Sequence, residues 1–356
     1  MENERSLKEF GMATENDDLS DPDRSTPSRA HPTRPMWLLG AQAVVGLVAL
    51  LTLMLTAFAW PAANIAPRDL PIGLAAPDPV AAQIEQGLSR GAEGALEITR
   101  VADRTEAERL IRDRRTYGAI VVDPTGASVL TASAASPVVA QLLGQLANNL
   151  GQAFGQQLQI VDVVPQPADD PRGAGLASAA LPLVIGGLAA AALLTRLLPG
   201  AVARLVGTLS LAVVSGLAMA AVLQFWLGSL EGSYWANAGV LALAIGASAT
   251  ALLGLERLLG NAGLGLGAAV LLLLGNPLSG LTSAPELLPR GWGDLGQLLP
   301  PGAAGTAMRS VSFFDGAGSG RALVVLLSWL GVGIVLSLLP RFRRPAEDRH
   351  EAFTAS

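Results

Sequence analysis

"MWLLGAQAVVGLVALLTLMLTAFAW" spans residues 36–60 without a charged residue, and this run decides the fold class. At about 1.5 Å per residue, a helix of this length exceeds the ~30 Å hydrocarbon core of a bilayer. Trp37 and Trp60 lie at its two ends, where a spanning helix places interfacial aromatic residues. The run is also longer than the apolar region of a signal peptide, about 7–15 residues. The sequence therefore predicts an uncleaved transmembrane helix over residues 36–61.

Five further apolar blocks follow after a long polar interval. They cover residues 177–198, 201–228, 236–258, 262–281 and 321–340. The composition agrees with a membrane protein, because 51% of the residues are hydrophobic and only 15% are charged. We therefore predict a polytopic α-helical membrane protein with six transmembrane helices in a 1 + 5 layout. Residues 177–340 are expected to form a five-helix, permease-like domain.

The distribution of arginine predicts the orientation. Eight arginines that flank the apolar blocks fall on one side if the N-terminus is inside: Arg34, Arg196, Arg204, Arg257, Arg341, Arg343, Arg344 and Arg349. The short loop "SLEGSYWAN" (229–237) has no Lys or Arg, as the positive-inside rule requires of an outside loop. Both termini are then cytoplasmic. Residues 1–35 form one tail, whose composition predicts disorder, and residues 341–356 form the other. Arginine supplies nearly all the positive charge, since Lys8 is the single lysine, and alanine and glycine are abundant. This composition suggests a bacterial protein, whose membrane is then the plasma membrane.

Residues 62–176 must then lie outside, and they have the pattern of a small extracytoplasmic α/β domain. Five strand-like runs occur: "LPIGLAA" (70–76), "ALEITRVA" (95–102), "YGAIVVD" (117–123), "SVLTASA" (128–134) and "QIVDVVP" (159–165). Helix starts are predicted at Asp78, at a capping box formed by Thr105 and Glu108, and at Ser136. Strands that alternate with helices imply a layered α/β fold.

Several classes of chemistry are disfavoured. The chain has no cysteine, and its histidines, His31 and His350, lie in the tails. The expected outer domain has no Walker A or GxGxxG pattern, and the chain has no Gly-x-Ser-x-Gly pattern, so an enzyme, a bound cofactor and a metal site are not expected. A nucleic acid is not an expected partner either, because the sequence has no basic stripe with aromatic residues. Between the fifth and sixth spans lie Glu286, Asp294, Asp315, Arg290 and Arg309, which we interpret as solvated loop charges, with a paired-carboxylate site as the weaker alternative.

The fifth block ends in "GNPLSGLTSAPELLP", residues 275–289. Its helix-breaking and polar residues are expected to form an outer break or gate: Asn276, Pro277, Ser279, Gly280, Pro285 and Pro289. Non-helical backbone at membrane depth is tolerated only against protein or a wet cavity. We therefore predict that residues 276–320 form a re-entrant or interfacial segment over the outer mouth of the bundle. The alternative is a kinked helix end followed by an ordinary loop.

Polar and small residues inside the apolar blocks give two further expectations. Gln42 and Gln224 are interpreted as interhelical hydrogen-bonding residues, in preference to a transport site. Gly246, Thr250 and Gly254, and also Gly263 and Gly267, have the small-xxx-small spacing. That spacing fits internal helix packing and a dimer face equally well.

Short motifs resemble the phage infection protein (YhgE/Pip) branch of type-2 ABC exporter permeases. They are "NPLSG" (276–280), "LLPPGAA" (298–304), "YGAIVVD" (117–123) and "DDPRGAGL" (169–176). The chain departs from the larger members in its compact outer domain. The resemblance implies export of a hydrophobic or amphipathic substrate by a homo- or heterodimer in membrane lipid.

Because the chain has no Walker A lysine, any ATPase must be a separate subunit. Its expected contacts are the short cytoplasmic turns with Arg196, Arg204 and Arg257. The competing interpretation is a non-transporting envelope receptor or scaffold, whose outer domain binds a partner or a cell-wall component.

Overall fold

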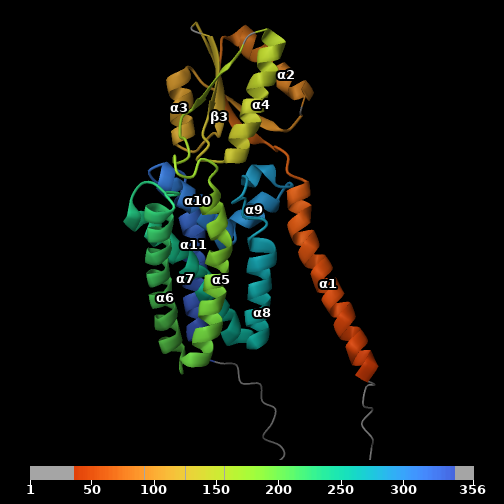
Figure 1. Ribbon diagram of the computed structural model, residues 1–356, viewed down its shortest axis with the longest axis vertical. Helices are drawn as coiled ribbons and strands as arrows, with labels where there is room; N and C mark the ends of the chain where they lie inside the picture. Colours follow the sequence, from red (N-terminus) through yellow and green to blue (C-terminus); the bar gives the residue numbers. More distant parts are fainter. Residues whose placement is uncertain (1–35, 92, 125, 156, 341–356) are drawn as a thin grey trace, which may run out of the picture. The chain divides into compact units, whose positions relative to one another are not determined.

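The structure is a computed structural model that describes residues 36–340 except 92, 125 and 156 (Figure 1). The chain divides into two units, with the division between Leu50 and Leu51. The first helix, α1 (Met36–Ala63), begins in the first unit and ends in the second, with Pro61 in its last turn. Its residues 40–63 are long and apolar enough to cross a membrane.

A five-stranded sheet forms the α/β domain. Its elements are β1 (Leu70–Ala75), α2 (Asp78–Gly91), β2 (Leu96–Arg100), α3 (Arg104–Arg112), β3 (Gly118–Asp123), β4 (Gly126–Thr131), α4 (Pro137–Phe154) and β5 (Gln159–Asp162). The strand order is β2-β1-β3-β4-β5, and every pair is parallel except the β3–β4 hairpin. The five strands expected from the sequence are therefore confirmed.

Strand β3 explains why the sheet needs helices on both faces. Ile120 packs into one core with α2 and α4, whereas Ala119 and Val121 pack into a second core with α3. This alternation is the two-residue period of a strand that is buried on both sides.

Two helix starts in the domain test the predicted caps. Ser136 caps α4 as expected, because its side chain accepts a hydrogen bond from the Val139 amide. The predicted box at Thr105 and Glu108 is wrong by two residues. Asp103 accepts from the Glu106 amide at 2.9 Å, and the Glu106 carboxylate accepts from the Ala102 amide. An aspartate earlier in the segment forms the reciprocal pair.

The second half of the chain is a helical bundle. Its long helices are α5 (Ala174–Leu197), α6 (Ala201–Ala221) with the π-helical extension η1 (Val222–Trp226), α7 (Tyr234–Leu259) and α11 (Gly320–Leu338). With α1, five helices within residues 36–340 are long and apolar enough to cross a membrane.

The expected fifth span, residues 262–281, is shorter in the structure. Helix α8 (Asn261–Ala269) continues as the π-helix η2 (Val270–Gly275) and ends there. Its fifteen residues rise at most about 22 Å, less than the ~30 Å hydrocarbon thickness. Leu278 and Leu281, which prolonged the apolar block, are buried beyond the helix end instead of facing outward.

Helix α7 lies at the centre of the bundle. Of its apolar window 78% is buried, against 28% for α6 and for α11. A Cβ on Gly254 would lie 2.8 Å from the Leu336 Cβ of α11, and the Thr250 hydroxyl donates to the Gly246 carbonyl at 2.8 Å. Gly263 and Gly267 lie against residues of α7 in the same way. Both small-residue patterns therefore serve packing within the chain.

Residues 276–320 join η2 to α11 through three short elements. These are the 3₁₀ turn η3 (Pro285–Leu287), α9 (Trp292–Gln297) and α10 (Pro300–Phe313). They lie between the bundle and the α/β domain (Figure 1). Helix α10 is buried along almost its whole length, so this region is part of the packed protein.

Candidate functional site

Residues 276–289, here called the strap, leave the helical path directly after Gly275, where the sequence predicts a break. The Asn276 carbonyl accepts from the Ser279 hydroxyl at 2.7 Å, and Gly280 has a φ of 67°. A Cβ on Gly280 would lie 2.8 Å from the Pro285 nitrogen, so the turn requires glycine. Pro285 begins η3, and the Pro289 carbonyl accepts from the Trp292 amide.

Side chains from three other elements satisfy the carbonyl groups that the strap leaves without helical partners. Gln297 of α9 donates to the Ser279 carbonyl at 3.0 Å. Arg309 of α10 donates to the carbonyls of Gly280 and Leu281. Ser136 donates to the Ser283 carbonyl at 2.8 Å. Irregular backbone is thereby paired inside the protein, as membrane depth would require.

The strap also belongs to the core of the α/β domain. Ala284 and Leu287 pack in the same core as Leu70 and Ile72 of β1. The Arg68 side chain donates to the Leu287 carbonyl at 2.9 Å, and the Ala66 amide donates to the same oxygen. The sheet and the strap are thus one packed assembly, whereas the sequence suggested a lid over the bundle alone.

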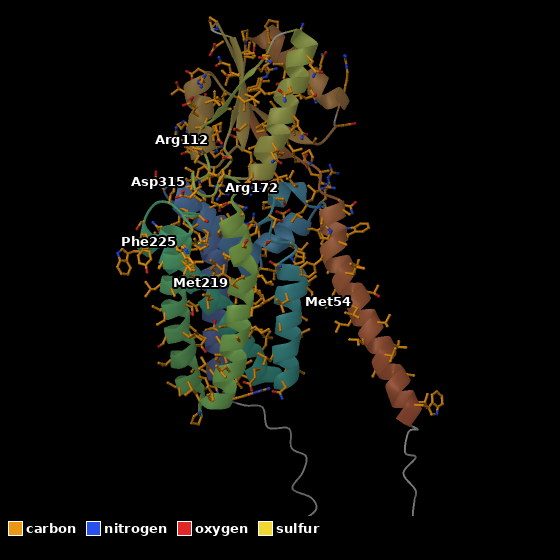
Figure 2. All side chains as sticks on the ribbon, viewed as in Figure 1. Met54, Arg112, Arg172, Met219, Phe225 and Asp315 are labelled. Atoms are coloured by element: carbon orange, nitrogen blue, oxygen red, sulfur yellow. The ribbon has the colours of Figure 1, made fainter. Side chains whose placement is uncertain are left out.

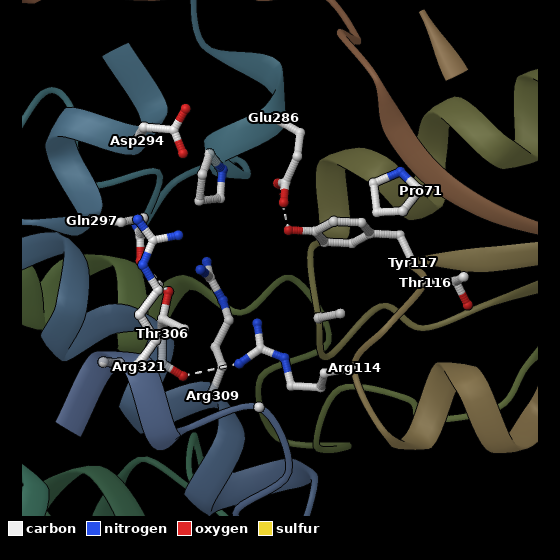
Figure 3. A pocket seen from close by; sticks show the side chains of 14 residues that line it. Pro71, Arg114, Thr116, Tyr117, Glu286, Asp294, Gln297, Thr306, Arg309 and Arg321 are labelled. Carbon is white, nitrogen blue, oxygen red and sulfur yellow. Dashed lines mark hydrogen bonds between the residues drawn. The ribbon is translucent and has the colours of Figure 1, made fainter. Parts of the chain in front are cut away.

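A cavity of about 360 Å³ lies between the strap, α10, α11 and the α/β domain. Among its lining residues are Arg114, Tyr117, Glu286, Asp294, Arg309 and Arg321, and we call it the arginine pocket (Figure 3). The guanidinium group of Arg309 points into the same space as those of Arg114 and Arg321, beside the Tyr117–Glu286 pair (Figure 3).

Arg309 is the most deeply buried charge of this pocket, with 6% of its surface exposed. Burial, and secondly the nearby charge of Arg114, lower the pKa of Arg309 to about 10. It therefore remains protonated at neutral pH. Within the described residues no carboxylate lies at ion-pair distance from Arg309, and its hydrogen bonds go to carbonyl oxygens only. The charge of Glu286 partly offsets the lowering of the Arg309 pKa from beyond ion-pair distance. A buried cation without a direct ion pair is costly, so the pocket favours an anion.

Arg114 and Tyr117 reach the pocket from the loop after α3. Arg114 has a φ of 56°, and its side chain donates to the Thr306 carbonyl at 2.9 Å and to the Ser310 hydroxyl at 2.7 Å. Burial lowers the pKa of Arg114. The Tyr117 hydroxyl donates to the Glu286 carboxylate at 2.7 Å. Burial, and then the charge of Glu286, raise the pKa of Tyr117, so this phenol remains neutral.

A second cavity, of about 500 Å³, also borders the strap. Its lining includes Ile65, Ala177, Leu181, Asn276, Pro277 and Leu281, and we call it the apolar pocket. The strap therefore contributes different residues to a cationic cavity and to a mainly apolar one.

The polar residues expected inside the membrane have different surroundings. Gln42 is exposed on α1. Gln224 lies in η1, near the end of its helix, where it donates to the Gly232 carbonyl and accepts from Asn237 of α7 at 3.1 Å. Asn237 in turn accepts from Ser312 of α10 at 2.8 Å. The interhelical hydrogen bonding expected of Gln224 is therefore observed.

The three arginines proposed as ATPase contacts lie at the end of the bundle away from the α/β domain. Arg196 is exposed near the end of α5. Arg204 is 3.8 Å from the buried carboxylate of Glu256 and donates to the Leu198 carbonyl. Arg257 donates to the Leu339 carbonyl at 2.7 Å. Arg196 is the most accessible of the three.

The interpretation of Glu286 and Arg309 as solvated loop charges is wrong, because both line the arginine pocket and Arg309 is buried. Arg114, Tyr117 and Arg321 were not recognised from the sequence. One signal was present, since Arg309 stands alone in the small and apolar run "GAAGTAMRSVSF", residues 302–313. Within the described residues, no group of three or more potential metal-ligating carboxylates is found.

We found no protein family, curated protein or solved structure that matches this chain.

Proposed function

We propose that the chain is an integral membrane permease that exports an amphipathic substrate, with a separate subunit supplying the ATPase. The observation that carries this proposal is the strap, which follows a helix too short to cross a bilayer and borders both a cationic and an apolar cavity. A substrate with an anionic head and an apolar body has matching surfaces in these two cavities.

The placement of aromatic and charged residues supports an orientation with the α/β domain outside the plasma membrane. Trp226 and Trp235 are 81% and 74% exposed at the end of the bundle next to this domain. The neighbouring Phe225 projects away from the bundle (Figure 2). Exposed aromatic residues at one level are typical of a membrane interface. Arg196 and Arg257 lie at the opposite end, which the positive-inside rule assigns to the cytoplasm together with both termini.

A dimer in membrane lipid and an ATPase partner belong to the same proposal. Five spanning helices and the shorter α8–η2 would form each half; the 1 + 5 layout is what the resemblance to the phage infection protein branch implies. The exposed Arg196, beside the short turn between α5 and α6, is the best-placed ATPase contact.

Co-purification tests the proposal. The full-length protein, extracted from its native membrane in mild detergent, should retain a stoichiometric ATPase. Arg196→Glu should reduce the retained amount, whereas Arg112→Glu, an exposed change on the α/β domain, should not. Loss of the ATPase from the unaltered protein, together with a retained wall component or protein ligand, would support the receptor or scaffold alternative instead.

The strap can be tested separately. Pro277 lines the apolar pocket, so Pro277→Ala should lower the stimulation of a co-purified ATPase by lipophilic compounds while membrane levels stay normal. Gly280→Ala should not be combined with this change. Gly280 has a φ of 67°, and an added Cβ would lie 2.8 Å from the Pro285 nitrogen, so the variant would disturb the strap itself.

A further inference from the structure

We propose that the arginine pocket binds the phosphate group of an anionic phospholipid. This inference concerns binding alone and holds whether or not the protein exports a substrate.

The charges of the pocket define what it attracts. Arg114, Arg309 and Arg321 provide three positive charges, and Glu286 and Asp294 provide two negative ones. The surplus of one positive charge is opposite in sign and equal in magnitude to the single negative charge of a phosphodiester. Glu286 is engaged by the Tyr117 hydroxyl, and Asp294 is exposed, so the carboxylates leave Arg309 without an ion pair among the described residues.

The arrangement of the three guanidinium groups favours a phosphate over a carboxylate. A carboxylate presents two oxygens in one plane and is served by a single arginine. The pocket instead brings together arginines from three segments, the loop after α3, helix α10 and the start of α11. A tetrahedral phosphate presents several oxygens in different directions, and arginine is well suited to bind them.

Arg321 places the pocket at the level of lipid headgroups. It is the second residue of α11, whose residues Gly320–Leu338 are long and apolar enough to span a bilayer. The first residues of such a helix lie at the interface, where phosphate groups are found. The first turn of α11 has no acidic residue, and Arg321 has no hydrogen bond or ion pair within the described part of the chain. A cation at a helix N-terminus is unfavourable unless an anion accompanies it.

The apolar pocket supports a lipid over free phosphate. It borders the same strap, has a volume of about 500 Å³ and is lined largely by apolar residues such as Ile65, Leu181 and Leu281. An acyl chain attached to the bound phosphate can occupy this space or the surrounding bilayer.

Binding by the purified full-length protein in detergent tests the inference. The probes are dihexanoyl-phosphatidylglycerol, dihexanoylglycerol with the same chains but no phosphate, and inorganic phosphate, each titrated by calorimetry. The variants are Arg321→Gln at the exposed rim, Arg309→Gln at the buried end, and Arg112→Gln as an exposed control outside the pocket.

We expect saturable binding of the phosphatidylglycerol, weakened about tenfold by Arg321→Gln, as expected for loss of a charge-assisted hydrogen bond. Arg112→Gln should change the dissociation constant less than about twofold, and dihexanoylglycerol should show no dependence on Arg321. If Arg309→Gln fails to fold, Arg321→Gln still decides the outcome. Equal effects of Arg321→Gln and Arg112→Gln would overturn the phosphate site. Tighter, Arg321-dependent binding of inorganic phosphate would overturn the assignment to a lipid.

Discussion

Replacing Tyr117 by phenylalanine should loosen the strap. The substitution removes only the hydroxyl group that donates to Glu286 at 2.7 Å and leaves the aromatic ring in place. A hydrogen bond to a charged group contributes about 1.5–3 kcal/mol, so we expect local opening of the strap to become easier by about 2 kcal/mol. That energy corresponds to roughly 30-fold faster hydrogen exchange.

Exchange of the backbone amides of Leu287 and Leu288 measures this opening. Both donate within the η3 turn, to the carbonyls of Ala284 and Pro285 at 3.1 and 3.2 Å. Glu286→Ala should accelerate their exchange to a similar degree, and the double variant should add little to either single change. The chain provides a matched control in Tyr234, whose hydroxyl donates to the Leu217 carbonyl inside the bundle. Tyr234→Phe should leave exchange in the strap unchanged. Unaltered exchange in Tyr117→Phe, or fully additive effects, would refute the coupling of the α/β domain to the strap.

Three further outcomes are expected. Gly296→Ala should destabilise the protein by about 3 kcal/mol in thermal unfolding, since its Cβ would overlap the Leu278 carbonyl, whereas Gly265→Ala, with open space around it, should be neutral or slightly stabilising. Asn237→Ala should cost about 3 kcal/mol, because a fully buried amide loses hydrogen bonds to η1, to the following loop and to α10. Phosphatidylglycerol binding should stay constant from pH 7 to 9 and weaken as the pH rises through about 10. The pKa of Arg309 is lowered to about 10, so its positive charge is lost above that value. Weakening already below pH 8 would contradict the role of Arg309.

The α/β domain was predictable because its signals are local. The apolar run at Tyr117–Asp123 and the Ser136-Pro137 start depend on strand period and capping within a few residues. The end of the helix at Gly275 was predictable for the same reason, since Pro277 and Gly280 oppose a helix wherever they occur.

The true length of the fifth span and the arginine pocket depend on contacts that are distant in sequence. Hydropathy extended the fifth block because Leu278 and Leu281 are apolar, but these side chains are buried in the fold after the helix has ended. Arg309 is buried because the strap, 28 residues earlier, presents a free carbonyl group to it. Arg114 itself has a left-handed backbone conformation in the loop after α3, and its side chain enters the pocket from there. The residues that bury or bind these side chains lie far away in the sequence, so a pattern within a few residues cannot reveal them.

Accessibility to labelling tests the membrane arrangement most directly. The chain has no cysteine, so single cysteines can be introduced at exposed positions on the α/β domain, by Arg112→Cys, and in the turn after α5, by Pro199→Cys. A membrane-impermeant maleimide applied to intact cells should label the protein carrying Arg112→Cys. It should label the protein carrying Pro199→Cys only after permeabilisation. The reverse pattern would contradict an α/β domain outside the membrane, opposite the arginine-bearing turns.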